Sequence, residues 1–300
     1  MSKYLYHLQD KDFQRLYKIS TENRWLETQV SFSDDEKALA FLHAPTLDYF
    51  KFIFSFLAMA EELININILK LIEPIEVADV QHYYIEQMAL ETVHARAYRI
   101  ILDLLHNNDA QQLKDTVDEF LKSPELNAKI SYLKHTLSMC NTFGKRVIVM
   151  IVLEGIFFIS SFISIASLRA LGFAGITEIN TYICRDEKVH TDAATALFLN
   201  YVPFEERPSA QFVHEVFSTV VEMEKDFINS KISGTSLASA PIFSTLHFTA
   251  DNLLKNIGYS PIFHAPPPDI CPLEMSLVEK NVCFFEKRNT EYCTHLYNDL

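Results

Sequence analysis

The run from Val147 to Leu168 constrains the fold more than any other part of the sequence, because it is apolar except for Glu154 and scattered serines. Its length would span a bilayer. A carboxylate inside a membrane-spanning helix, however, costs about 2.5–3.5 kcal/mol even on the lenient insertion scale. A helix that is apolar on all sides is also what the centre of a large soluble core requires. We therefore predict that residues 147–168 form a buried helix of a helical bundle.

Helix breakers are scarce along the rest of the chain. Only six glycines occur in 300 residues, and 49% of the residues are hydrophobic, which suffices for a large core. Apolar residues recur at helical spacing over long stretches, so we predict an all-α protein. The expected helices cover residues 46–71, 77–106, 124–140, 147–168, 175–199, 209–229 and 239–257, with a shorter one after a turn at 107–109.

A change of character near residue 259 predicts the domain organisation. We expect residues 1–258 to form one helical domain that includes an N-terminal arm over residues 1–44. The three prolines at 266–268 cannot continue a helix, and the residues beyond them show no clear periodicity. We therefore predict that residues 259–300 form an extended, largely disordered tail. Its aromatic residues would equally suit a tail that folds onto a partner.

The charge and cysteine patterns argue against several classes of protein. A net charge of −13 without a basic stripe argues against binding to nucleic acid or to anionic membranes. The five cysteines are scattered and lack CxxC pairing, which is typical of a reducing compartment and disfavours a thiolate zinc site. The N-terminus lacks the apolar segment of a signal peptide, so we expect a cytoplasmic protein.

The segment from Glu91 to Tyr98 is the first candidate for chemistry. Glu91 and His94 are three residues apart, and Tyr98 follows His94 by four, so all three share one face of a helix. A carboxylate and an imidazole at this spacing can share a metal ion, and the phenol would then lie one turn from that metal.

A second Glu-x-x-His pair consists of Glu187 and His190. A single pair of this kind arises readily by chance. Two more glutamates, Glu61 and Glu154, stand in apolar helical runs, where burial of an unpaired charge is costly. Glu62 competes with Glu61, but Glu61 shares its helix face with apolar residues and is the preferred candidate.

One Glu from each of two helices and a Glu-x-x-His pair from each of two others form the ligand set of a ferritin-like helical bundle with a di-metal carboxylate site in its core. Several anionic oxygens would offset the repulsion between two close cations, and oxygen and imidazole ligands suit iron or manganese. The predicted metal ligands are Glu61, Glu91, His94, Glu154, Glu187 and His190.

The order and spacing of these motifs resemble the small, radical-generating subunit of class I ribonucleotide reductase, and most of all its herpesvirus branch. The resemblance covers nearly the whole chain. The motifs that carry it lie at Asn23–Thr28, Glu91–Tyr98, Glu154–Phe162, Arg185–His190 and Phe284–Tyr292.

The resemblance implies a mechanism and the roles of further residues. Two iron ions per chain, with manganese as the alternative metal, would react with O₂, and Tyr98 would become a stable tyrosyl radical. The other residues implied are Phe158, Phe162 and Ile183 in the pocket around the radical, and Trp25, Asp186 and His94 in a relay of electron and proton from the surface to the iron.

The resemblance also implies partners. Tyr292 in the tail would pass the radical to a large subunit, on which the C-terminal residues would dock. That subunit would bind the ribonucleoside diphosphate and supply the reducing thiols. In the formal reaction of the enzyme, a disulfide of the thioredoxin or glutaredoxin type would be the acceptor. A homodimer is implied as well. Many cellular members have Asp where this chain has Glu61, so the geometry of the first metal site is left open.

Three other functions remain open. A ferritin-like ferroxidase would need the metal cage but neither Trp25 nor Tyr98. A di-iron oxygenase would act on a small substrate of its own. A metal-free bundle that serves only as an interaction protein would need none of the six ligand residues, yet all six are present.

Overall fold

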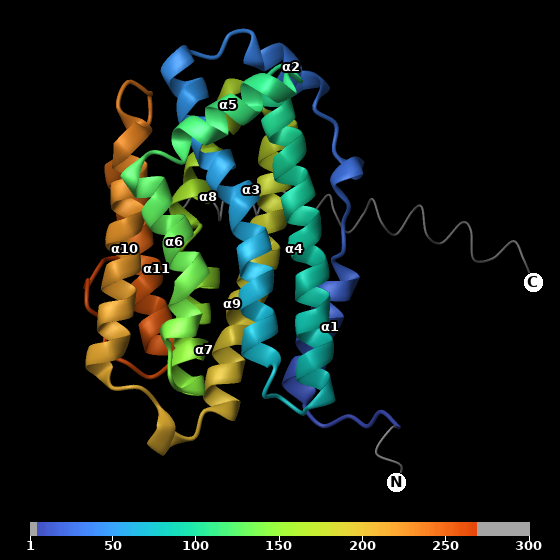
Figure 1. Cartoon of the computed structure of the whole chain (residues 1–300), viewed down its shortest axis with the longest axis vertical. Helices are drawn as coiled ribbons and strands as arrows, with labels where there is room; N and C mark the ends of the chain where they lie inside the picture. The colour runs from blue at the N-terminus through green and yellow to red at the C-terminus, as the bar shows by residue number, and fades with distance from the viewer. Residues whose placement is uncertain (1–4, 269–300) are drawn as a thin grey trace, which may run out of the picture.

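The computed structural model describes residues 5–268, and every regular element in that range is a helix (Figure 1). The prediction of an all-α protein is therefore confirmed. Short 3₁₀ turns cover Glu27–Gln29, Ser167–Leu171 and Phe204–Glu206. The α-helices are α1 (Lys11–Glu22), α2 (Ser33–Leu39), α3 (Ala44–Ile72), α4 (Ala78–Leu105), α5 (Ala110–Phe120), α6 (Pro124–Met139), α7 (Phe143–Gly155), α8 (Ile159–Ala166), α9 (Ala174–Tyr201), α10 (Ala210–Ile232) and α11 (Ser239–Asn256).

Side-chain caps fix where several helices begin. The side chains of Asp10, Asp109, Ser123, Thr142 and Ser209 each accept a hydrogen bond from a backbone N–H in the first turn of the helix that follows. Each cap satisfies a donor that the helix itself leaves unpaired and contributes about 1 kcal/mol. Local sequence therefore explains the starts of α1, α5, α6, α7 and α10.

Four helices form the centre of the molecule. Helix α3 packs along α4, α7 packs along α9, and α4 also contacts α9. Helices α6, α10 and α11 lie on one side of this group, while α1 covers α4 and α9 on another, as Figure 1 shows. A side chain that points inward from α3, α4, α7 or α9 is therefore enclosed by helices.

The apolar run at 147–168 is buried as predicted, but it is not one helix. Helix α7 ends at Gly155 and α8 begins at Ile159. The N–H groups of Ile156 and Phe157 both donate to the carbonyl of Val152, at 3.0 and 3.1 Å. The second of these bonds spans five residues, which is the mark of a widened, π-type turn. Hydrophobic periodicity could not reveal this turn, because every residue around it except Glu154 is apolar or small.

Two buried carboxylates tie the N-terminal arm to the bundle. Asp79 accepts from the N–H groups of Gln9 (2.7 Å) and Asp10 (2.9 Å). Asp35 accepts from the N–H groups of Gly175 and Ile176, both at 2.8 Å, and so caps the start of α9. These contacts hold the loop between α1 and α2, which carries Trp25, against the core.

Residues 259–268 are non-helical, as predicted, but they pack against the bundle, whereas the sequence predicts disorder there. Asp251 in α11 accepts from the N–H groups of Ile262, Phe263 and Ala265, each at 2.9 Å. The hydroxyl of Tyr259 donates to the carbonyl of Pro208 at 2.7 Å. The rest of the predicted tail, from residue 269, lies outside the described residues.

Two stretches within the described residues are long and apolar enough to cross a membrane, Ala44–Ile72 and Phe143–Leu171. The most apolar windows of these stretches are 61% and 94% buried inside the protein, respectively. Burial to this degree is expected of core helices in a soluble bundle.

Candidate metal centre

The six predicted ligands come together in the core. Glu61 lies on α3, Glu91 and His94 on α4, Glu154 on α7, and Glu187 and His190 on α9, and each side chain is buried. They form two groups of four in which the ligand atoms lie within 4.8 Å of one another: Glu61, Glu91, His94 and Glu187, and Glu91, Glu154, Glu187 and His190. Because Glu91 and Glu187 belong to both groups, the arrangement suits two neighbouring cations with shared carboxylates.

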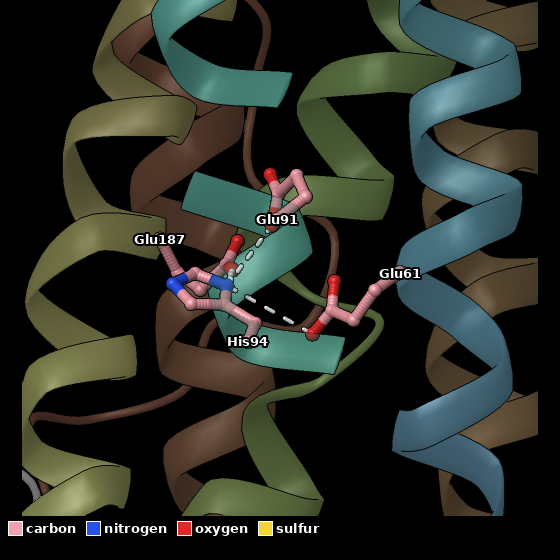
Figure 2. Close-up of side chains that lie close together, drawn as sticks. All are labelled: Glu61, Glu91, His94 and Glu187. Atoms are coloured by element: carbon pink, nitrogen blue, oxygen red, sulfur yellow. Dashed lines mark ion pairs between the residues drawn. The ribbon is translucent and has the colours of Figure 1, made fainter. Parts of the chain in front are cut away.

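The first group converges on Nδ1 of His94, as Figure 2 shows. This nitrogen lies 2.9 Å from Oε2 of Glu91, 3.3 Å from Oε1 of Glu187 and 3.9 Å from Oε1 of Glu61. Glu61 approaches from α3 on the side opposite α9, which carries Glu187 (Figure 2). Its neighbour Glu62 is exposed, so Glu61 is the residue of the two that lies in the group.

The second group converges in the same way on Nδ1 of His190. This atom lies 3.0 Å from Oε1 of Glu91, 3.5 Å from Oε2 of Glu187 and 3.9 Å from Oε2 of Glu154. Glu91 thus presents one carboxylate oxygen to each imidazole, and Glu187 does the same. The two imidazole rings lie 6.0 Å apart between centroids.

The donor atoms fit a pair of metal ions better than a hydrogen-bonded polar cluster. Nδ1 of each histidine, both oxygens of Glu187, and Oε2 of Glu61, Glu91 and Glu154 are buried without a hydrogen-bond partner. Buried polar atoms are almost always paired, since each unpaired one costs about 1–3 kcal/mol. Atoms that crowd one another without aligned hydrogen bonds are what a shared cation would satisfy.

Burial and neighbouring charges shift the pKa values of the carboxylates in the cluster. Burial, and then the charge of Glu91, raises the pKa of Glu61 well above its usual value. Burial and Glu187 do the same to the pKa of Glu154. Burial alone would raise the pKa of Glu91 as well, but the neighbouring His190 and His94 lower it. The cluster therefore holds protons that a divalent cation would displace.

Tyr98 lies at the edge of this cluster with its phenol buried. Its hydroxyl has no hydrogen-bond partner, and burial, followed by the charge of Glu61, raises its pKa well above the usual value. Its ring packs against Phe54, at 6.0 Å between centroids. Phe54 belongs to the apolar face of α3 that helical spacing predicts, because it precedes Glu61 by seven residues and so shares its helix face.

The three predicted pocket residues are all buried, and two of them are neighbours. The rings of Phe158 and Phe162 lie 6.1 Å apart, and Ile183 is fully buried on α9. Phe158 belongs to the widened turn between α7 and α8, so its place depends on that turn and not on continuous helical spacing from Glu154.

Trp25, Asp186 and His94 form a continuous chain of contacts, as the resemblance implies. The indole N–H of Trp25 donates to Oδ2 of Asp186 at 2.7 Å, and the same oxygen lies 3.3 Å from Nε2 of His94. Arg185 donates to the other oxygen of Asp186 and to the carbonyl of Asn23. Asp186 therefore links the arm to the far side of a candidate metal ligand.

Gln87 is a site residue that sequence reasoning missed. Its Nε2 donates to Oε1 of Glu154 at 2.9 Å and to Oε1 of Glu91 at 3.3 Å. It precedes Glu91 by one helical turn, and that spacing is the only signal in the sequence. Because the amide joins α4 to α7, it orients one ligand on each helix.

Tyr292 and the C-terminal residues, to which the resemblance assigns the relay and docking roles, lie outside the described residues. Their roles therefore stay predictions.

Comparisons with known proteins agree with this site. Residues 2–272 match the family model described as ribonucleotide reductase, small chain. The ribonucleoside-diphosphate reductase small subunit of equine herpesvirus 2 is 40% identical over 100% of this chain and 99% of its own length. Other herpesvirus small subunits are 36–38% identical over 99–100% of this chain.

Solved structures share the fold. A dimanganese(II) protein, NrdF of Streptococcus sanguinis, has a TM-score of 0.81 and 21% identity, with 93% of this chain and all of that chain covered. A ribonucleotide reductase homodimer from Saccharomyces cerevisiae has a TM-score of 0.81 and 19% identity, with 95% and 91% covered. At these identities the likeness concerns the fold alone, and it confirms the ferritin-like bundle.

Proposed function

The chain belongs to the ribonucleotide reductase small-chain family, and we propose that its buried cluster holds two iron ions with which Tyr98 is oxidised to a tyrosyl radical. Members of this family are small subunits of ribonucleoside-diphosphate reductase, an oxidoreductase that converts ribonucleotides to deoxyribonucleotides. The observation that carries the proposal is the pair of ligand groups that share Glu91 and Glu187 close to a buried, unpartnered phenol.

The ligands divide into two sets. Glu61, Glu91 and His94 would hold one ion, and Glu154, Glu187 and His190 the other, with Glu91 and Glu187 in reach of both. Bound iron would supply one-electron chemistry with O₂, which amino-acid side chains alone do not start. Manganese is the alternative metal, because oxygen and imidazole donors suit both.

Tyr98 has the surroundings that a protected radical requires. Its raised pKa keeps the phenol protonated, so oxidation must remove the proton together with the electron. The ring of Phe54 and the buried Phe158, Phe162 and Ile183 supply apolar surface that would keep water and reductants from the oxidised ring. The chain's contribution is therefore to exclude solvent and to hold the phenol beside the ligands.

Trp25, Asp186 and His94 are proposed to carry an electron and a proton between the surface and the metal site. The indole of Trp25 is 3% exposed and lies nearly parallel to the imidazole of His94, with 6.0 Å between ring centroids. Asp186 accepts from the indole and contacts the imidazole. A negative carboxylate between the two rings would stabilise positive charge that develops on either.

A centre sealed in this way cannot also admit a ribonucleotide, so the radical must act elsewhere. We propose that it passes through Tyr292 to a large subunit, on which the C-terminal tail docks. We also propose a homodimer, which the structural neighbour from Saccharomyces cerevisiae, itself described as a homodimer, supports. We also propose a cytoplasmic location, in the host cell for a viral member, and the burial of both apolar stretches inside the bundle supports it.

Electron paramagnetic resonance of the iron-loaded chain after exposure to O₂ tests the radical. A tyrosyl signal is expected in the wild-type chain and is expected to be absent in Tyr98→Phe, which removes one oxygen and keeps the ring. Tyr84→Phe is the matched control, because Tyr84 is also a buried phenol on α4 without a hydroxyl partner. That variant should keep the signal.

The same experiment separates the rival functions. Iron oxidation without any radical in the wild-type chain would indicate a ferroxidase and would contradict the proposal. A radical that survives in Tyr98→Phe would place the oxidised residue elsewhere.

Removal of the last nine residues tests the docking role. The truncated chain is expected to form the tyrosyl radical normally, because the metal centre lies in α3, α4, α7 and α9. Its reductase activity with a large subunit should be lost. Full activity of the truncated chain would rule out docking through this end.

A further inference from the structure

Lys129 is a fully buried lysine outside the metal centre, and it is paired with the fully buried Glu224. Lys129 lies on α6 and Glu224 on α10, so the ion pair joins two helices that flank the central four. Removing two charges from water costs so much that a buried pair rarely stabilises a protein more than apolar residues of the same size would. A role in positioning explains such a pair better than a role in stability.

The ammonium group of Lys129 reaches the widened turn between α7 and α8. Its Nζ donates to the carbonyl of Phe157 at 2.9 Å. The turn displaces this carbonyl from the regular helical pattern, and a buried carbonyl needs a donor from elsewhere. Lys129 supplies that donor from a different helix.

Aromatic rings enclose the ammonium group. Nζ lies 3.8 Å from the ring centroid of Phe56, and 4.4 Å from those of Phe157 and Phe227. These rings come from α3, the widened turn and α10. Cation–π contacts of this kind are strongest when the cation is removed from water, as it is here. Together with Glu224, they fix the ammonium group in one place.

The turn to which Lys129 donates lies between a candidate metal ligand and a residue of the predicted radical pocket. Glu154 is at the end of α7, three residues before Phe157, and Phe158 follows Phe157 directly. Phe56, which contacts the ammonium group, also lies 5.9 Å from the ring of Phe158. A shift of the Phe157 carbonyl would therefore move both neighbours.

We propose that Lys129, held by Glu224, is a positioning residue that fixes the widened turn at 156–158. It thereby orients the carboxylate of Glu154 toward the second metal site, the group around His190. This inference rests on the proposed di-metal function and deepens it. It predicts that the pair affects the site of Glu154 and His190 more than the site of Glu61 and His94.

Mn²⁺ binding to the full chain tests this inference without reference to activity. Free Mn²⁺ can be followed by its electron paramagnetic resonance signal during titration. Two backgrounds isolate the sites: Glu61→Ala leaves the group around His190, and Glu154→Ala leaves the group around His94. Lys129→Met should weaken Mn²⁺ binding about tenfold in the first background, which is the usual scale for outer contacts of a metal ligand, and less than twofold in the second.

Two further variants make the test decisive. Lys129→Met combined with Glu224→Met removes both charges and avoids an unpaired buried carboxylate, so it tests positioning even if Lys129→Met alone does not fold. Lys225→Met is the matched control, because Lys225 forms an ion pair with Glu222 on the surface of α10. It should leave Mn²⁺ binding unchanged in both backgrounds.

The outcomes separate the possible roles of the pair. Equal loss of affinity in both backgrounds, or a lowered melting temperature with no loss in either, would overturn the inference and leave the pair a purely structural role. A wild-type chain that bound no Mn²⁺ would contradict the proposed function itself.

Discussion

Asp186 joins two side chains that are far apart in the sequence. Its Oδ2 accepts from the indole of Trp25 and contacts the imidazole of His94, while its other oxygen faces Arg185. Burial would raise the pKa of Asp186, but His94, Arg185 and Trp25 lower it. A carboxylate that stays ionised in the core can orient His94 through the ring nitrogen that faces away from the cluster.

Asp186→Asn should therefore weaken metal binding while the fold is kept. The amide is neutral and places an N–H₂ group toward either Arg185 or His94, so the orientation of the imidazole is lost in part. We expect about a tenfold loss of Mn²⁺ affinity, measured by titration. Asp192→Asn, at an exposed residue of the same helix that pairs with Lys188, should have no effect. Equal affinities of the two variants would contradict the orienting role.

At the scale of elements, the segment 259–268 shows how one carboxylate can order a stretch without a helix. Asp251 accepts three backbone N–H groups from this segment. Burial would raise the pKa of Asp251, but the N–H groups of Phe263, Ala265 and Ile262 lower it. Because the folded pKa is lowered, this stabilisation is present above the unfolded value of about 3.9 and is lost as pH falls through the folded pKa.

Asp251→Asn should release this segment at neutral pH. The amide accepts through one oxygen only, so at least one N–H loses its acceptor, at a cost of about 1–3 kcal/mol. Hydrogen exchange at residues 262–265 should be faster in the variant at pH 7. In the wild-type chain the same amides should lose protection only below about pH 4. Asp226→Asn, at an exposed residue of α10, serves as the control. Unchanged exchange in Asp251→Asn would show that other contacts hold the segment.

At the scale of the whole molecule, the metal centre concentrates like charges in the core. Four glutamates lie together there, and they are included in the net charge of −13 that the chain carries. Their mutual repulsion opposes folding unless protons or cations offset it. Cations that bind only the folded state stabilise it by mass action.

Metal loading should therefore raise the melting temperature. At a free Mn²⁺ concentration of 100 times the dissociation constant, each site contributes about 2.7 kcal/mol, or roughly 4–5 °C for a protein of this size. Scanning calorimetry with and without Mn²⁺ measures the shift, and a chelator should reverse it. A variant with Glu91→Ala and Glu187→Ala, which lacks both shared carboxylates, should show no shift. Wild-type chain without a shift would argue against a site formed in the folded state.

The sequence by itself determined the helices and the set of candidate ligands. Periodicity and local caps act within a few residues, so the limits of α3, α4, α9, α10 and α11 agree with prediction to within about three residues. Glu-x-x-His spacing selects Glu91, His94, Glu187 and His190. The apolar context selects Glu61 and Glu154, because a buried carboxylate needs a partner.

Only the tertiary structure decided which groups from different helices support those ligands. Gln87 donates hydrogen bonds to Glu91 and Glu154. Lys129 donates to the turn that divides the run at 147–168. Asp251 accepts from a segment for which the sequence predicts disorder. Each of these depends on a partner far away in the chain or on a backbone group freed by a bend. Local sequence patterns do not predict such partners, because a hydrogen bond between distant segments imposes no spacing on the sequence.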